Sequence, residues 1–199
     1  MEEEVFVIDS EEIHERDSHG TRRILYMALG STFAFMLYSL LVLAPAGKCF
    51  KVDEGSNSLG LTFSYTLGMV QEFFESRSTS QLDCYSEFLQ IWDVMFAIIY
   101  TSMYCFWILY FFQNRRILLM IPLLGMVADW SENVVEIMMI NSYLDSSTIS
   151  ETLVSIGSGL NMFKWMMSTL TYLVIFAGIG IKIKSVMNRS KNNDENLVH

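Results

Sequence analysis

Several residue types are scarce in this chain of 199 residues, and each scarcity excludes a class of function. The three cysteines form no C-x-x-C pair, and no cysteine accompanies His14 and His19 in the N-terminal tail. Neither a thiol-redox centre nor a metal site is therefore predicted. A glycine-rich phosphate loop, a G-x-S-x-G motif and a serine–histidine pair in an apolar segment are also missing. The sequence gives no support for a hydrolase, a kinase or a metalloenzyme, and we expect no cofactor.

Charged residues are few and unevenly distributed. They make up 18% of the chain, against roughly 25% in soluble domains. The net charge of −9 comes mostly from the first 17 residues and from the segment between the first two apolar blocks. Such an acidic chain is not expected to bind nucleic acid.

Apolar sequence is abundant, and it is gathered in four long blocks at about residues 24–46, 91–112, 117–140 and 153–181. A helix of about 20 apolar residues crosses the roughly 30 Å of hydrocarbon in a bilayer and satisfies its own backbone polar groups. The sequence therefore predicts an all-α bundle of four transmembrane helices, with membrane lipid as its surroundings. The first block is too long for the core of a cleaved signal peptide and follows an acidic tail, so we expect it to be a span.

Basic residues near the ends of the blocks predict the orientation. They occur at 22–23, at 115–116 and after the last block, whereas residues 141–152 contain none. Because Lys and Arg concentrate on the cytoplasmic side of a membrane, both termini are predicted to be cytoplasmic. The resulting division is an acidic, disordered tail (1–21), a membrane domain (22–184) and a second cytoplasmic tail (185–199).

The acidic tail contains a short apolar run, V-F-V-I, at residues 5–8. Flanked by acids, this run resembles a SUMO-interaction motif, which would add as a strand to the sheet of a partner protein. A solvated tail that binds no partner is the simpler interpretation.

The outward loop predicted at residues 47–90 is long enough to fold over the outer end of the bundle. Residues 66–76 place their large apolar side chains on one side, which predicts a short interfacial helix. These side chains are Leu67, Val70, Phe73 and Phe74. Ser80, followed by Asp83, resembles a capping box for the segment that leads into the second span.

Two cysteines, Cys49 and Cys84, fall in the same loop. In an oxidising compartment they would form a disulfide that closes about 35 residues, and in a reducing one they would be free thiols. The sequence does not choose between these states. Cys105, inside the second block, is most simply a small apolar core residue.

The third block carries three acids and an amide within apolar sequence. Asp129, Glu132, Asn133 and Glu136 are spaced at i, i+3, i+4 and i+7, so they share one face of a helix. A charge at the centre of a bilayer costs about 3 kcal/mol on insertion scales, so such residues are expected to face the bundle interior and to be paired.

The fourth block supplies a single base, Lys164. The short loop before it makes the third and fourth helices antiparallel neighbours, and matching their depths places Asp129 opposite Lys164. Glu132 then lies opposite Asn161, and Glu136 opposite Gly157. We predict an Asp129–Lys164 ion pair near the middle of the membrane, with Glu132 as the competing partner. One lysine cannot neutralise three acids, so the surplus requires protons, water or a bound cation.

The second block adds Asp93 and Tyr100 on the side that continues to Tyr104 and Trp107. Asp93 near the start of a span is most simply a solvated end, and the aromatic residues are most simply core packing. The residues considered for a binding site are Asp93, Tyr100, Asp129, Glu132, Asn133, Glu136, Asn161 and Lys164. Asp129 and Glu132 are also the candidates for catalytic proton transfer.

Some of these residues carry a resemblance. F-S-Y at 63–65, Tyr85, D-x-x-F-x-x-x-Y at 93–100, P-x-x-x-x-x-x-D-x-x-E-N at 122–133 and K-W at 164–165 resemble a family of uncharacterised four-helix membrane proteins. The resemblance covers roughly residues 24–181. It implies the four-span topology and draws attention to Asp93, Asp129, Glu132, Asn133 and Lys164, but it implies no activity.

Three functions fit the sequence. The first is a small membrane protein that binds or acts on a lipid or another hydrophobic small molecule through the buried acids. The second is a non-catalytic scaffold or subunit in which the polar residues only fix helix packing. The third is a proton- or cation-coupled transporter or channel subunit, which with four helices would need to be a homo-oligomer.

Overall fold

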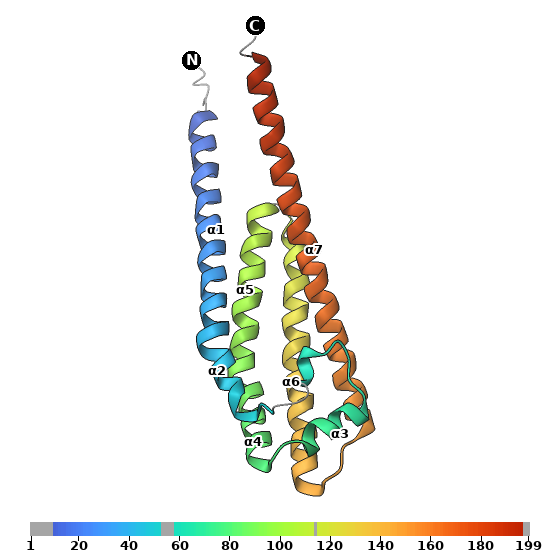
Figure 1. The fold of residues 1–199 in the computed structure, drawn as a ribbon. Helices are drawn as coiled ribbons and strands as arrows, with labels where there is room; N and C mark the ends of the chain where they lie inside the picture. Colours follow the sequence, from blue (N-terminus) through green and yellow to red (C-terminus); the bar gives the residue numbers. More distant parts are fainter. Residues whose placement is uncertain (1–9, 53–57, 114, 197–199) are drawn as a thin grey trace, which may run out of the picture.

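The computed structural model of the chain describes residues 10–52, 58–113 and 115–196, with the side chains of residues 20–52, 58–113 and 115–188. All regular secondary structure in these ranges is helical. Four stretches are long and apolar enough to cross a membrane, namely Gly20–Phe50, Thr79–Phe111, Arg116–Ser146 and Glu151–Asn188. The chain is therefore an all-α, multi-pass membrane protein, as the sequence predicts (Figure 1).

The first span is almost continuous helix. It comprises α1 (Ser10–Tyr38), a π-helical turn (Ser39–Leu43), α2 (Ala44–Ala46) and a 3-10 turn (Gly47–Phe50). The expectation of disorder is wrong for residues 10–21, which are helical, because no proline precedes Pro45 and nothing ends the helix at the membrane surface. The apolar run at 5–8 lies outside the described residues.

The second span begins well before the predicted residue 91. It comprises α4 (Thr79–Glu87), a π-helical segment (Phe88–Asp93) and α5 (Val94–Phe111). Its N-cap is Ser78, whose side chain accepts a hydrogen bond from the backbone of Gln81, while the Gln81 side chain accepts one from the backbone of Ser78. The predicted box of Ser80 and Asp83 is wrong, because Ser78 and Gln81 already supply both halves of the motif two residues earlier.

The third and fourth spans are single helices. A 3-10 turn (Arg116–Leu119) leads into α6 (Met120–Ser146), and α7 (Glu151–Asn196) follows after a short loop. The C-cap of α6 is Ser147, which has a left-handed backbone with φ of 52°. α7 continues past the predicted end at residue 181 into the basic C-terminal segment.

The helices pack mainly in two pairs. α1 lies along α5, and α6 lies along α7, while α5 also contacts α6 and α7. α1 and α7 are not among the closely packed pairs, and Figure 1 shows them on either side of α5 and α6. The beginning of α1 and the end of α7 lie at the same end of the bundle.

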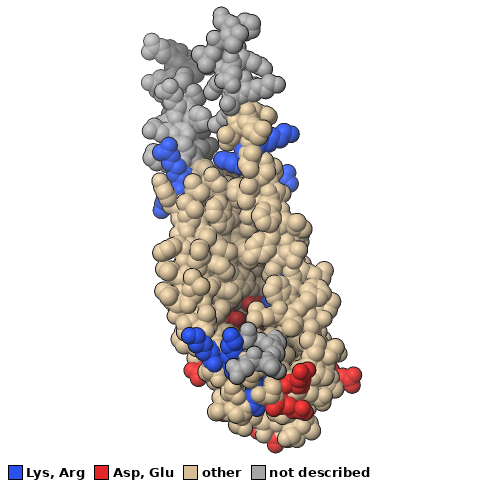
Figure 2. All heavy atoms as spheres, in the orientation of Figure 1, with Lys and Arg blue, Asp and Glu red and all other residues tan. Residues whose placement is uncertain are grey.

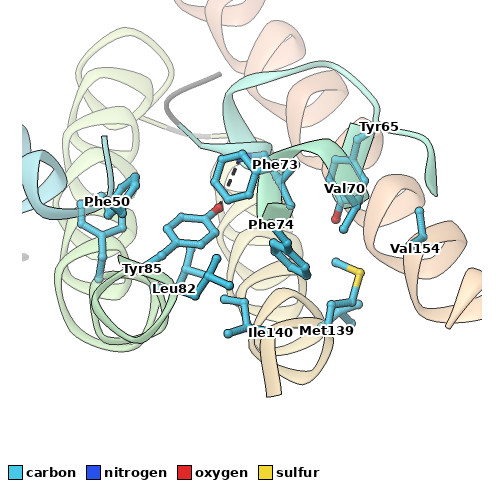
Figure 3. Close-up of a cluster of buried hydrophobic side chains, with 14 residues drawn as sticks. Phe50, Tyr65, Val70, Phe73, Phe74, Leu82, Tyr85, Met139, Ile140 and Val154 are labelled. Carbon is cyan, nitrogen blue, oxygen red and sulfur yellow. Dashed lines mark hydrogen bonds between the residues drawn. The ribbon is translucent and has the colours of Figure 1, made fainter. Parts of the chain in front are cut away.

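The loop between the first two spans folds over the other end of the bundle. It contains a 3-10 turn (Leu59–Leu61) and the predicted short helix α3 (Leu67–Glu75). The apolar face of α3 packs onto the protein, since the ring centroids of Phe73 and Tyr85 lie 5.1 Å apart (Figure 3). Those of Phe74 and Tyr143 lie 5.2 Å apart. A Cys49–Cys84 disulfide ties the end of the first span to α4.

Candidate functional site

The acidic face of α6 is buried within the bundle. Relative exposure is 4% for Asp129, 0% for Glu132, 4% for Asn133 and 1% for Glu136. The i, i+3, i+4, i+7 spacing therefore directs all four side chains inward, as the sequence predicts. Glu136 is buried beside Tyr85 of α4 and is not exposed at the outer surface.

The single lysine of α7 bridges two acids of α6. Lys164 Nζ lies 3.1 Å from Asp129 Oδ1 and 2.5 Å from Glu132 Oε2. The predicted Asp129–Lys164 pair is confirmed, and Glu132 is a simultaneous partner rather than a competing one. Lys164 Nζ also donates to the backbone carbonyl of Gly60 at 3.3 Å. Three acceptors thus engage the three N–H groups of this ammonium.

Asp129, Asp93 and Glu136 each accept a hydrogen bond from a neutral side chain. Tyr100 donates to Asp129 Oδ2 at 2.9 Å, and Asn133 Nδ2 donates to Asp93 Oδ2 at 2.9 Å. Tyr85 donates to Glu136 Oε2. Asp93 is half-buried, so it is not the solvated helix end that its position in the sequence suggested.

The outer loop occupies the positions that the sequence assigned to contacts between α6 and α7. Asn161 Nδ2 donates to the carbonyl of Thr62 at 2.6 Å, and the Tyr65 ring lies against Gly157. The expectation that Asn161 faces Glu132 and Gly157 faces Glu136 is therefore replaced by contacts with the loop. Burial raises the pKa of Tyr65, and Glu136 and Glu132 raise it further, so this phenol stays protonated.

A cavity of about 280 Å³ lies beside this network. Three carboxyl groups, those of Asp93, Asp129 and Glu136, line it together with Lys164. Six aromatic residues contribute to its walls, namely Phe35, Phe96, Tyr100, Tyr104, Trp165 and Tyr172. Because Phe35 belongs to α1 and Tyr172 to α7, the cavity lies between these two loosely associated helices.

The cavity is open on one side of the bundle. Figure 2 shows a hollow in the lower part of the tan face, just above basic side chains, with acidic and basic atoms visible inside it. In the matching view of Figure 1, this hollow lies between α1 and α7. The charged groups are therefore reached through an apolar surface.

The charges of the site do not balance. Asp93, Asp129, Glu132 and Glu136 face a single base, Lys164. Glu132 Oε1 and Glu136 Oε1 are both buried and have no hydrogen-bond donor among the described residues. These two carboxyl groups lie within reach of each other, so a proton shared between them, or a cation, would satisfy both oxygens.

Sequence reasoning missed several residues of the site. Phe35, Gly60 and Tyr172 come from three separate segments, and no pattern in the sequence connects them to the acids of α6. Trp165, which donates to Gly60 at 3.2 Å, and Tyr85 were marked only through the resemblance. Trp107, on the same side of α5 as Tyr100, instead donates to Thr32 at 3.0 Å and fixes α1 to α5.

Comparisons of the chain with family models, with curated proteins and with solved structures found no match. The family resemblance described above therefore stays a prediction. Among the described residues, no group of three or more His, Cys, Asp and Glu side chains is arranged to hold a metal ion. The function has to be inferred from the cavity and its lining.

Proposed function

We propose that this membrane protein binds one end of a lipid or another amphiphilic small molecule in the cavity between α1, α5, α6 and α7. The observation that carries the proposal is the placement of a polar, charged floor behind an opening in an apolar face (Figure 2). A ligand with a polar head and an apolar tail matches such a site, because its tail can remain in the bilayer.

The size of the cavity supports partial enclosure of the ligand. A volume of about 280 Å³ is just below the roughly 300–1,000 Å³ typical of ligand pockets. A headgroup fits within it, whereas a complete lipid with its acyl chains does not. The tail would leave between α1 and α7, where the two helices are not closely packed.

The depth of the site agrees with such a ligand. A rise of about 1.5 Å per residue places Asp129 about 20 Å along the helix from Arg116. With both termini in the cytoplasm, as the basic residues at that end favour, the cavity lies in the outer half of the bilayer. A headgroup would then enter from the outer leaflet, beneath the loop that contains Gly60.

The residues divide into two roles. Asp129 and Glu132 are held by Lys164, so they fix the joint between α6 and α7 and position the floor of the cavity. Asp93 and Glu136 line the cavity without contacting the lysine, and they would face the headgroup. If the protein also catalyses a reaction, a cavity-lining carboxyl group is the proton donor or acceptor within reach of a ligand.

Native mass spectrometry of the purified protein tests the proposal. Ser168 lines the cavity, whereas the neighbouring Thr169 faces outward. Ser168→Trp should fill the cavity and remove a co-purified amphiphile, while the matched Thr169→Trp should retain it. If wild type and both variants carry the same bound lipids, the polar residues serve helix packing and the scaffold function takes precedence.

A further inference from the structure

The charged side chains that line the cavity indicate the charge of its ligand. Three carboxyl groups and one ammonium line it, and that ammonium is already engaged by Asp129, Glu132 and the Gly60 carbonyl. Within the part of the chain that the structure describes, Lys164 is the only basic side chain of the lining. The charged groups of the lining therefore carry excess negative charge, and their one ammonium is already engaged.

A second and independent observation is an acceptor that lacks a donor. Glu136 is 1% exposed and lines the cavity, and its Oε2 accepts from Tyr85. Its Oε1 is buried and has no hydrogen-bond donor among the residues that the structure describes. A buried carboxylate oxygen without a donor is costly, so a ligand that brings an N–H group would stabilise it.

Aromatic residues form much of the wall of the cavity. Phe96 and Tyr100 pack edge to face with their centroids 5.4 Å apart, and Tyr104 continues the same wall. Trp165 lies on the α7 side of the cavity. Aromatic rings attract a cation that lies within about 6 Å of their faces, and this attraction strengthens when the cation is desolvated.

We infer that the ligand is an amphiphile with an ammonium headgroup, a primary amine in preference to a quaternary one. The primary amine supplies the N–H donors that Glu136 and Asp93 can accept, and its positive charge offsets the excess of carboxylates. The aromatic wall would flank the headgroup, and the alkyl tail would pass between α1 and α7. This inference rests on the proposed function, since it names the class of molecule that the same cavity takes.

The experiment compares four probes on the full chain in neutral maltoside micelles, with binding read by native mass spectrometry. Dodecylamine carries the proposed headgroup, dodecanol and dodecyl sulfate carry neutral and anionic ones, and methylammonium lacks the tail. Because charge-assisted hydrogen bonds are stronger than neutral ones, dodecylamine should bind about tenfold more tightly than dodecanol. Dodecyl sulfate and methylammonium should bind more weakly still.

Substitutions of the cavity-lining acids test whether dodecylamine binds in the cavity. Glu136→Gln and Asp93→Asn keep side-chain shape and remove one charge each, and each should weaken dodecylamine binding about tenfold. Glu87→Gln removes a charge from an exposed site on α4 and should change nothing. Asp93→Asn keeps the test open if Glu136→Gln does not fold.

The outcomes separate the two proposals. If dodecylamine and dodecanol bind equally tightly and Ser168→Trp weakens both, the ligand does not need an ammonium headgroup, but the cavity still binds an amphiphile. A proton shared by Glu132 and Glu136 would then reduce the excess negative charge. Methylammonium binding as tightly as dodecylamine would point to a soluble amine and overturn the amphiphile. Insensitivity of every probe to Ser168→Trp would overturn both.

Discussion

At the scale of single residues, Lys164 holds the buried polar network together. Among the residues with described side chains, it is the only base that contacts the buried acids of α6, and its side chain is 13% exposed. Two carboxylates and a backbone carbonyl converge on it, so the ammonium links α6, α7 and the outer loop. Removal of this one charge leaves two acids without a counter-charge.

Lys164→Met is therefore expected to lower the stability of the protein strongly. Breaking a buried ion pair from one side costs about 3–5 kcal/mol. Thermal unfolding in detergent measures the loss, and Lys48→Met, at an exposed position of the outer loop, is the control. The triple variant Lys164→Met, Asp129→Asn, Glu132→Gln should regain much of the stability, because no unpaired charge remains. A triple variant as unstable as the single one would contradict this interpretation.

A close contact between the loop and α7 supplies a second prediction at this scale. A Cβ on Gly157 would collide with the Tyr65 hydroxyl and lie 3.1 Å from Val135 Cγ1, whereas a Cβ on Gly159 would meet nothing within 4 Å. Gly157→Ala should destabilise the protein by about 1–3 kcal/mol through overpacking. Gly159→Ala should be neutral or mildly stabilising. Equal melting temperatures for the two variants would refute the observed packing of the loop.

The sequence predicted the ion pair because its determinants are local. The 3.6-residue period fixes which α6 residues share a face, and a short loop fixes the depth of Lys164 relative to them. The contacts of Asn161 and Gly157 could not be predicted in this way. Asn161 and its partner Thr62 are 99 residues apart, and which loop residue reaches α7 depends on the folding of the whole loop.

At the scale of elements, the outer loop is more ordered than a connection between spans needs to be. α3 packs its apolar face onto α4 and α6, and the 3-10 turn at Leu59–Leu61 brings Gly60 to the lysine. The four apolar blocks were predictable from composition alone. The early start of the second helix could not be predicted in this way, because α4 lies in polar sequence and its N-cap depends on only two residues, Ser78 and Gln81.

The cap of α4 can be tested directly. Ser78→Ala removes the side-chain acceptor for the Gln81 backbone and should cost about 1 kcal/mol. Ser80→Ala, which would remove the cap if the helix began two residues later, should cost less, since Ser80 only hydrogen-bonds the Ser78 hydroxyl at 3.1 Å. Thermal unfolding measures the loss of stability in both variants. A larger loss for Ser80→Ala than for Ser78→Ala would contradict the observed start of α4.

The disulfide gives a further prediction for the loop. Cys49 and Cys84 are 35 residues apart, and closing a loop of that length is worth about 3–4 kcal/mol in the chain-entropy model. Reduction with dithiothreitol should lower the melting temperature of wild type and of Cys105→Ala. It should leave the melting temperature of Cys49→Ser/Cys84→Ser unchanged. Equal sensitivity of the double variant to the reductant would argue against this pairing.

At the scale of the whole molecule, the bundle is asymmetric in a way that creates the site. Two helix pairs, α1–α5 and α6–α7, meet chiefly through α5, so α1 and α7 leave an opening beside the acids. The outer loop closes the cavity at one end, and basic residues lie at both ends of the bundle (Figure 2). A purely structural clamp would not need this opening.

Photolabelling in a bilayer tests the central claim most directly. A long-chain alkylamine with a diazirine near its amino group, incorporated in nanodiscs with the protein, should form adducts on the cavity-lining residues Phe35 and Tyr104. These adducts should disappear in Ser168→Trp and persist in Thr169→Trp. Labelling confined to outward-facing residues such as Phe33 and Phe176, and identical in all three proteins, would contradict a cavity that opens to lipid between α1 and α7.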